Sequence, residues 1–345
     1  MRFFVGILLG LGLMTAGWLG ALLLQAGRPT VSSQWIADAY RLKTGATAGI
    51  AGPKIVIVAG SSALFGLDAG MIERAYGLPT INFGVNAGLL LPYVLHKSKE
   101  ILRSGDIVLM PLEYGFYTYD GVPNVQMIDQ IWSRDPGFLR QLSLLEQLRM
   151  GWLVSAERLL EGFLARGGAP AMCGPYGYQN IDGRGDQTHT SAAEALAWAS
   201  DWANLQKELP RRYGADARHP EAWAWLGRYL DWARNRGVRV IVTPPTMMFD
   251  PFYRDDARER AFYQGLGPRV EALGVPFVGD PYAYMYERQW YFNTDYHLND
   301  LGRQRHTRRV IADLGPDLAG ALGQGGPGPG PGKEPARDPS ERPAK

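Results

Sequence analysis

Cysteine is almost absent from this chain of 345 residues, which contains a single one, Cys173. One cysteine cannot form an intramolecular disulfide, so the cysteine content does not indicate an oxidising or a reducing compartment. No strand-and-turn context surrounds Cys173, which argues against a catalytic thiol. The net charge is also small, at +2, and it predicts no nucleic-acid partner.

Motifs for cofactors and metals are missing as well. No group of histidine, cysteine and carboxylate residues has the spacing of a metal site, and no glycine pattern of the Walker or dinucleotide-binding type occurs. His96, His219 and His306 fall on or near expected helices and have no partners close in sequence. We therefore expect no cofactor and no bound metal.

What the chain does contain is a short apolar strand that ends in a sharp turn. Ile55–Val58 is apolar and β-branched, as in a strand that is buried on both faces of a parallel sheet. The small residues Gly60, Ser61 and Ser62 follow, and a helix capped by its first residue is predicted over Asp68–Tyr76. Ser62 would lie near a helix N-terminus, where free N–H groups favour an anion. This position suits a serine nucleophile, although Gly-Ser-Ser can also be a simple turn.

A second motif lies near the other end of the chain, in the sequence Asp295-Tyr-His297-Leu-Asn-Asp-Leu-Gly302. A serine nucleophile needs a base, and the base needs a group that holds its tautomer. We therefore predict Ser62 as nucleophile, His297 as general base and then acid, and Asp295 as the residue that orients the imidazole. For Asp295, capping of a loop is the alternative role.

Together, Gly60-x-Ser62 after the first strand and Asp295-x-His297 near the end resemble the SGNH (GDSL-type) hydrolase superfamily. In particular the chain is similar to its membrane-anchored bacterial branch, which includes D-alanyl-lipoteichoic-acid transfer proteins and alginate O-acetyltransferases. The resemblance extends over residues 53–314 and is loose in the middle third. The superfamily often spaces its pair as Asp-x-x-His, whereas the acetyltransferase branch uses Asp-x-His but places it before the serine.

The resemblance also implies an oxyanion hole, made of N–H donors that face the tetrahedral oxygen. The candidate donors are the backbone N–H of Ser62, Gly84 (or Gly88) in the second conserved block, and the side-chain amide of Asn86, for which helix or loop capping is the alternative. The third block of the family carries an asparagine, and this chain has Pro111-Leu-Glu-Tyr-Gly115 there instead.

Three further residues are candidate substrate contacts. Glu113 and Tyr114 belong to the segment that would end at the same sheet edge as Ser62. His189 follows Gly185 and Asp186 in a polar loop, and a surface position without function is its alternative.

Alternating strands and helices predict an α/β fold, namely an SGNH-like three-layer sandwich with a central parallel sheet, a helical insertion and an N-terminal transmembrane helix. The predicted strands are Ile55–Val58, Thr80–Phe83, Ile107–Met110, Val238–Thr243 and Val275–Val278. The predicted helices, besides Asp68–Tyr76, are Gln34–Lys43, Leu89–Leu102, Gly137–Leu164, Ser191–Leu209, Pro220–Arg236, Asp255–Leu273 and Asp300–Leu314. We expect a connector over 28–52, an α/β domain over 53–314 with the insertion at about 118–220, and a disordered Pro/Gly-rich tail over 315–345.

The run Phe3–Gln25 is apolar and uncharged and is long enough to span a bilayer. We expect an uncleaved signal anchor over residues 1–27, with a cleaved signal peptide as the alternative. Basic residues occur on both sides of the run, so the positive-inside rule does not decide the orientation. The resemblance implies a single-pass protein of the bacterial inner membrane with its domain in the periplasm.

The expected function is that of a serine-dependent acyl esterase or O-acyltransferase. The resemblance implies a cell-envelope or secreted polysaccharide as substrate, such as cellulose or another exopolysaccharide, with acetyl as the acyl group. It also implies a membrane-bound acyltransferase and a polysaccharide synthase as partners. The alternative is a non-catalytic carbohydrate-binding or assembly protein of a polysaccharide secretion complex on a degenerate SGNH scaffold.

Overall fold

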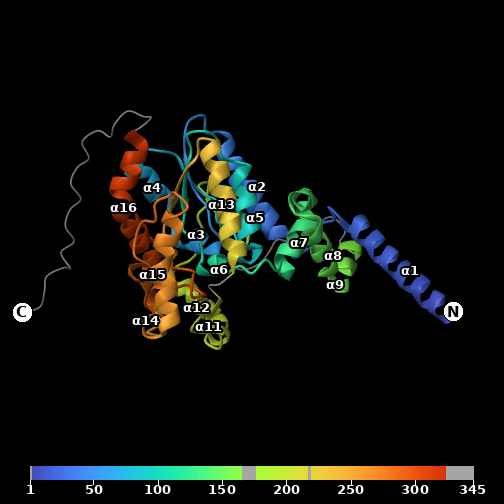
Figure 1. Ribbon diagram of the computed structural model, residues 1–345. Helices are drawn as coiled ribbons and strands as arrows, with labels where there is room; N and C mark the ends of the chain where they lie inside the picture. The colour runs from blue at the N-terminus through green and yellow to red at the C-terminus, as the bar shows by residue number, and fades with distance from the viewer. Residues whose placement is uncertain (1, 165–175, 217–218, 324–345) are drawn as a thin grey trace, which may run out of the picture.

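A four-stranded parallel sheet lies at the centre of the protein (Figure 1). The computed structural model describes residues 2–164, 176–216 and 219–323, so Cys173 and most of the predicted tail lie outside the described residues. The strands are β1 (Ile55–Ile57), β2 (Thr80–Asn82), β3 (Ile107–Met110) and β4 (Arg239–Val242), in the order β2-β1-β3-β4. All three pairings are parallel. The prediction of four parallel strands is therefore confirmed.

The fifth predicted strand, Val275–Val278, is wrong in part. Phe277 makes only an isolated parallel bridge to Val242, beyond the edge of β4. The segment contains Pro276, which has no N–H to donate to a ladder, so a longer pairing is disfavoured. A second, two-stranded parallel sheet, formed by β5 (Met247–Met248) and β6 (Met285–Tyr286), was not predicted.

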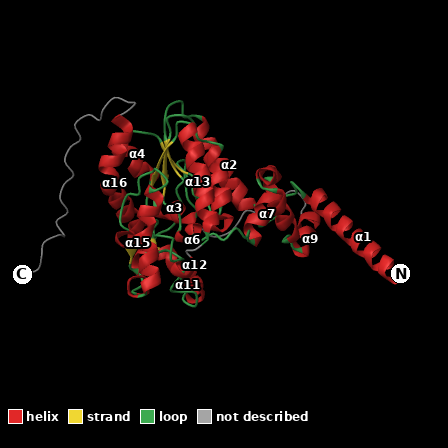
Figure 2. Cartoon of the chain, viewed as in Figure 1, coloured by secondary structure: helices red, strands yellow, loops and turns green. Residues whose placement is uncertain are grey.

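Helices cover both faces of the central sheet, because alternate residues of each strand point to opposite faces (Figure 2). On one face lie α4 (Ala69–Tyr76) and α16 (Asp300–Gly323). On the other lie α2 (Gln34–Ala48), α5 (Leu90–Lys99) and α13 (Pro220–Asn235). The result is a mixed α/β fold of three layers whose two apolar clusters meet at the sheet.

Two elements near the first strand differ from the prediction. Helix α2 continues to Ala48 rather than ending at Lys43. A glycine inside a helix costs only about 1 kcal/mol, and α2 buries an apolar face led by Trp35 and Ile36. The sharp turn after β1 is a short helix, α3 (Ser61–Gly66), which precedes the predicted α4. Asp68 caps α4 as predicted, accepting the N–H of Met71 at 2.8 Å.

The insertion is helical, as predicted, but its helices are shorter. The single helix expected over Gly137–Leu164 is interrupted at Ser143, whose side chain forms a capping box with Glu146 and so begins a new helix. A similar box at Ser191 begins the first of three pieces in place of Ser191–Leu209. The elements of the region are α7 (Val125–Arg134), a 3₁₀ turn (Pro136–Gln141), α8 (Leu144–Trp152), α9 (Ala156–Leu164), 3₁₀ turns at Tyr178–Asn180 and Leu196–Trp198, α10 (Ala192–Ala195), α11 (Ala199–Leu205) and α12 (Tyr213–Asp216).

The remaining elements connect the layers. They are a 3₁₀ turn (Ala87–Leu89), α6 (Tyr114–Tyr117), α14 (Phe252–Asp255), α15 (Ala257–Glu271), and 3₁₀ turns at Pro281–Tyr284 and Arg288–Trp290. The helix predicted over Asp255–Leu273 begins only after Asp256, which caps α15 by accepting two backbone N–H groups.

The N-terminal helix α1 (Arg2–Gln25) is long and apolar enough to cross a membrane. Almost all of its surface is exposed. Figure 1 shows α1 projecting from the end of the molecule at which α7, α8 and α9 gather, opposite α16. A helix of this kind is either a membrane span or a signal sequence.

Candidate active site

Ser62 lies in the first turn of α3, directly beyond the carboxyl end of β1. The turn is tight because Gly60 passes close to the neighbouring loop. A Cβ at Gly60 would lie 2.6 Å from the Cα atom of Ala87, so no larger residue fits there. Gly84 approaches the same turn, and a Cβ at Gly84 would lie 2.5 Å from the carbonyl oxygen of Gly60. The two glycines therefore bring the first and second loops of the sheet edge together.

The carboxylate of Glu113 binds the N-terminus of α3. Its two oxygens accept the backbone N–H groups of Gly60, at 2.9 Å, and of Ser62, at 2.8 Å. Glu113 is buried, and burial raises the pKa of its carboxyl group, while these N–H groups lower it in part. The N–H of Ser62 that was expected to serve an oxyanion hole is thus already occupied by an anion.

The hydroxyl group of Ser62 is buried and makes no hydrogen bond of normal geometry within the described part of the chain. The predicted hydrogen bond from Ser62 to His297 is therefore not formed here. Ser62 Oγ does lie close enough to the Glu113 carboxylate to lower the pKa of that group. A buried hydroxyl without a partner costs about 1–3 kcal/mol, so a hydroxyl at this position is not explained by stability.

His297 lies beside α3. Its imidazole stacks on the ring of Phe65, with centroids 4.0 Å apart and planes inclined by 5°. Phe65 is three residues after Ser62, and residues at this spacing share a helix face. Burial lowers the pKa of His297 to about 3, so the imidazole is neutral at neutral pH. A neutral imidazole is the form that can accept a proton from a serine hydroxyl.

Asn293, not Asp295, holds the imidazole of His297. The Nδ1 atom of His297 lies 2.8 Å from Oδ1 of Asn293, whose Nδ2 donates to Tyr176 Oη at 3.0 Å. Because that amide oxygen can only accept, Nδ1 carries the proton and Nε2 keeps its lone pair. Asn293 lies four residues before the histidine and was not predicted, because an acidic residue was expected in this role.

Asp295 faces the insertion instead. Its two carboxylate oxygens accept from Arg211 at 3.0 and 3.2 Å, and no hydrogen bond joins it to His297 in the described residues. The expected role of Asp295 as the orienting residue is therefore not supported by the geometry. The hydroxyl of Thr294 accepts the backbone N–H groups of Tyr296 and His297. This side-chain turn directs the carboxylate of Asp295 and the imidazole to different partners.

The backbone N–H groups of Gly84 and Gly88, the other predicted backbone donors, are also engaged. The N–H of Gly84 donates to Oδ1 of Asn82 at 3.1 Å. Oδ1 of Asn86 accepts the N–H of Gly88 at 2.6 Å and caps the 3₁₀ turn that follows. Capping, the alternative role for Asn86, is therefore what the structure shows for its amide oxygen.

The predicted substrate contacts are placed differently from one another. Glu113 reaches Ser62, as described. Tyr114 is fully buried and packs edge-on against the ring of Tyr263, so it belongs to the core. His189 is exposed and pairs with Glu194 at 3.2 Å, in agreement with its alternative as a surface residue.

A buried lysine, which the sequence analysis did not single out, supports the second loop. Nζ of Lys43 donates to the carbonyl oxygens of Asn82, Gly84 and Gly185 at 2.8, 2.7 and 2.6 Å. Burial lowers the pKa of Lys43 to about 7, an effect that the charge of Asp186 opposes. The side chain of Lys43 therefore connects α2, the Gly84 loop and the insertion through its hydrogen bonds.

The insertion covers the histidine loop. Trp202 Nε1 donates to the carbonyl oxygen of Phe292 at 2.9 Å, and Arg211 binds Asp295. The ring of Tyr176 lies edge-on to that of His297, with centroids 6.1 Å apart. These contacts come from three separate parts of the insertion and cover the loop that carries His297.

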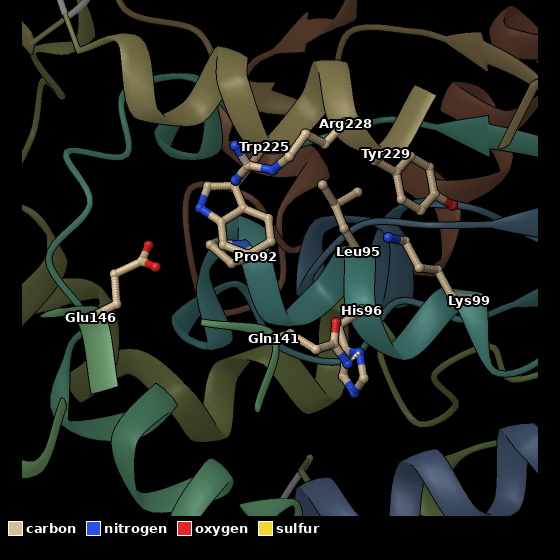
Figure 3. Close-up of a pocket in the computed structure, with 9 residues that line it drawn as sticks. All are labelled: Pro92, Leu95, His96, Lys99, Gln141, Glu146, Trp225, Arg228 and Tyr229. Carbon is tan, nitrogen blue, oxygen red and sulfur yellow. Dashed lines mark hydrogen bonds between the residues drawn. The ribbon is translucent and has the colours of Figure 1, made fainter. Parts of the chain in front are cut away.

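A pocket lies elsewhere, between α5, α13 and the segment that leads into α8 (Figure 3). His96 at its edge could form a cation site with Glu100 and Asp135. However, both ring nitrogens of His96 already have partners, Asp135 at 3.1 Å and Gln141 at 2.9 Å. Lys97 also supplies a positive charge 2.7 Å from Glu100. Ion pairs therefore account for the cluster.

The comparisons with known proteins add no relative. No protein-family model matches the chain, and neither a curated protein nor a solved structure matches it.

Proposed function

We propose that this protein is a serine-dependent acyl esterase or O-acyltransferase of SGNH type. The observation that carries the proposal is the position of Ser62: its buried hydroxyl has no hydrogen bond of normal geometry among the described residues, and it lies on the same helix as Phe65, on whose ring the neutral imidazole of His297 stacks. Other buried hydroxyls among the described residues, such as those of Tyr114 and Thr243, also have no partner, so it is the position beside the imidazole that distinguishes Ser62. A nucleophile that forms its catalytic hydrogen bond only when substrate is bound would fit this arrangement.

The chemistry would use His297 as a base and then as an acid in each of its two halves, acylation and deacylation. Ser62 Oγ attacks the acyl carbonyl carbon while Nε2 of His297 takes the hydroxyl proton. The tetrahedral intermediate collapses, the bond to the leaving alcohol breaks, and that alcohol receives the proton from Nε2. Nε2 then takes the proton of an attacking water or sugar hydroxyl, whose oxygen bonds to the acyl carbon. The bond between that carbon and Ser62 Oγ breaks, the acyl group leaves as the free acid or the new ester, and Nε2 returns the proton to Oγ. Asn293 holds Nδ1–H throughout, so the imidazole keeps its tautomer.

The substrate class and location follow from the resemblance in the motifs. They favour acetyl groups on a cell-envelope or secreted polysaccharide such as cellulose, with a membrane-bound acyltransferase and a polysaccharide synthase as partners. An apolar α1 that is retained would anchor the protein in the bacterial inner membrane. The domain would then face the periplasm, where the polymer emerges.

A second candidate function is favoured by Glu113. Its carboxylate occupies the N–H of Ser62, and a substrate oxyanion would have to displace it. On this basis the protein could be a non-catalytic binding or assembly protein of a polysaccharide secretion complex, in which the serine turn serves the fold. The two functions differ in whether Ser62 reacts.

A serine-reactive fluorophosphonate separates them. We expect the full-length protein to be labelled once, and the label to disappear in Ser62→Ala. Ser61→Ala is the matched control, because Ser61 is the half-exposed neighbour in the same turn. A strain carrying Ser62→Ala should also change the acyl content of its polysaccharide.

The Glu113→Gln variant tests whether the carboxylate of Glu113 competes with a substrate oxyanion for the Ser62 N–H. It removes the negative charge next to the Ser62 N–H, so labelling should become faster if Glu113 competes with the oxyanion. If neither the wild type nor Glu113→Gln is labelled, and the polymer of the Ser62→Ala strain is unchanged, the esterase proposal is wrong and the non-catalytic function stands.

A further inference from the structure

The surface of α8 and α9 is unusually apolar. Six large side chains along these two helices are between 57 and 83% exposed, and we call them the α8–α9 patch: Leu144, Leu145, Leu148, Trp152, Leu160 and Leu164. On α8 they include positions 145, 148 and 152, which share a helix face. Large exposed apolar side chains gathered on neighbouring helices of a folded protein mark a candidate interaction site.

Helices α8 and α9, which carry the patch, pack against the end of α1. Trp18 Nε1 donates to the carbonyl oxygen of Gly151 at 3.3 Å, and a Cβ at Gly151 would lie 3.2 Å from Leu22. Gly162 of α9 leaves room for the side chain of Gln25 in the same way. Small residues that let helices approach closely are typical of packing inside membranes. Figure 1 shows α8 and α9 beside α1, at the end of the molecule away from α16.

The depth of these contacts follows from helix geometry. A helix of the length of α1 rises about 36 Å, and the hydrocarbon core of a bilayer is about 30 Å thick. The contacts with α8 and α9 involve the last eight residues of α1, which extend over about 10 Å. If α1 spans the bilayer, the patch lies at the level of the outer interface.

A buried polar cluster connects the helices that carry the patch to the end of α1. Asp129 of α7 accepts from Thr30 at 2.8 and 2.9 Å and lies 3.3 Å from Nε of Arg158 of α9. Arg158 also donates to Gln25, the last residue of α1, at 3.2 Å. One buried polar network therefore joins the end of α1, the segment after it and α9.

We propose that the α8–α9 patch is a second membrane contact, which inserts into the lipid interface beside α1. The proposal rests on α1 being retained as a span, and it is independent of catalysis at Ser62. Lipid is the occupant that these observations favour, because the patch continues the exposed apolar surface of α1 at the same depth. Two contacts would hold the domain in a fixed orientation over the bilayer.

The experiment uses the full-length protein in phosphatidylcholine/phosphatidylglycerol vesicles. Single cysteines replace Leu148, Trp152, Leu23 and Arg308 in a Cys173→Ser background, and each carries the fluorophore NBD. Leu23 is an exposed position in α1 and reports insertion of that helix, and Arg308 is an exposed position in α16. Doxyl-labelled lipids then quench any NBD group that contacts the bilayer.

We expect quenching at positions 148 and 152 to reach at least about half that at 23, and to exceed that at 308 severalfold. Quenching at 23 without quenching at 148 and 152 overturns the proposal. So does an absence of quenching at 23, since the patch would then have no bilayer beside it. A disulfide between two copies of the unlabelled Trp152→Cys variant, together with an absence of quenching in the labelled one, would assign the patch to a second copy of this chain instead. The pattern should be the same in Ser62→Ala, so failure of catalysis and failure of docking are separate results.

Discussion

Asn293 has the position next to His297 that Asp295 was expected to fill. Asn293→Ala should therefore lower kcat/KM by at least about tenfold, because the imidazole loses the group that fixes its tautomer. Asp295→Asn should change kcat/KM little and should instead lower the free energy of unfolding, by about 1–3 kcal/mol, because it weakens a buried partner of Arg211. Ester hydrolysis and urea unfolding of the two variants give both quantities.

The opposite results for the two variants would show that Asp295 is the orienting residue after all. In that case Asp295→Asn would lose activity while keeping its stability, and Asn293→Ala would remain active. Arg211→Lys is a useful control, since it keeps the charge that faces Asp295 but not the two-point contact.

Two buried histidines make the stability depend on pH. Burial lowers the pKa of both His297 and His306 to about 3, whereas a histidine in the unfolded chain titrates near 6.5. The unfolded state then binds more protons below about pH 6.5, so the free energy of unfolding falls as the pH drops from 6.5 toward 3. His297→Asn should make this fall smaller by more than about 1 kcal/mol between pH 7 and pH 4.

Urea unfolding at pH 7, 6, 5 and 4 measures the effect. The comparison with His297→Asn is needed because carboxylates also contribute at low pH. Equal slopes for the variant and the wild type would show that His297 is exposed enough to be protonated in the folded protein.

At the scale of elements, Lys43 is the residue that holds several of them together. Lys43→Met should lower the free energy of unfolding by about 2–4 kcal/mol, because three carbonyl oxygens lose their charged donor. The loop at Gly185 should loosen first, so trypsin should cleave after Arg184 faster than in the wild type. Lys207→Met, at an exposed position, is the control and should change neither quantity. Resistance at Arg184 equal to that of the wild type would contradict this role for Lys43.

Structural features that depend on residues close together in the chain are the ones that the sequence predicts best. The four strands of the sheet were predicted because each is a short apolar run, and their parallel pairing follows from the helices between them. The strand predicted over Val275–Val278 is only a bridge at Phe277, because Pro276 within this apolar run has no N–H group to pair. Helix lengths in the insertion were wrong where a serine cap, such as Ser143, begins a new helix inside a periodic segment.

The site was harder to predict than the fold. The motifs predict Ser62 and His297 at one sheet edge, and in the structure His297 stacks on Phe65 of the helix that carries Ser62. They contain nothing about Arg211, which binds Asp295 although the two residues are 84 positions apart in the chain. The position of Glu113 over the Ser62 N–H is likewise a tertiary contact. Partners of buried charges are set by packing, and a single sequence does not carry that information.

At the scale of the whole molecule, the α8–α9 patch predicts how a soluble version would behave. A chain that lacks residues 1–25 should still aggregate or bind detergent, because the patch and the faces of Gly151 and Gly162 would be open to water. Adding Leu148→Glu and Trp152→Gln should make it monodisperse, with a Tm close to that of the parent. Size-exclusion chromatography with light scattering gives the result. A truncated chain that is monodisperse without these changes would contradict the prediction.

The Lys43 contacts also bear on the order in which this protein can fold. The last acceptor of Lys43, the carbonyl oxygen of Gly185, lies 142 residues further along the chain. Ribosomes add about 5–20 residues per second, so about 7–30 seconds pass between the synthesis of Lys43 and that of Gly185. During that time the first three strands are complete, but the ammonium group inside them has no full set of partners. The core of the N-terminal half is therefore completed only after Gly185 has been synthesised, and we expect this interval to be the one in which the nascent chain exposes most of its apolar surface.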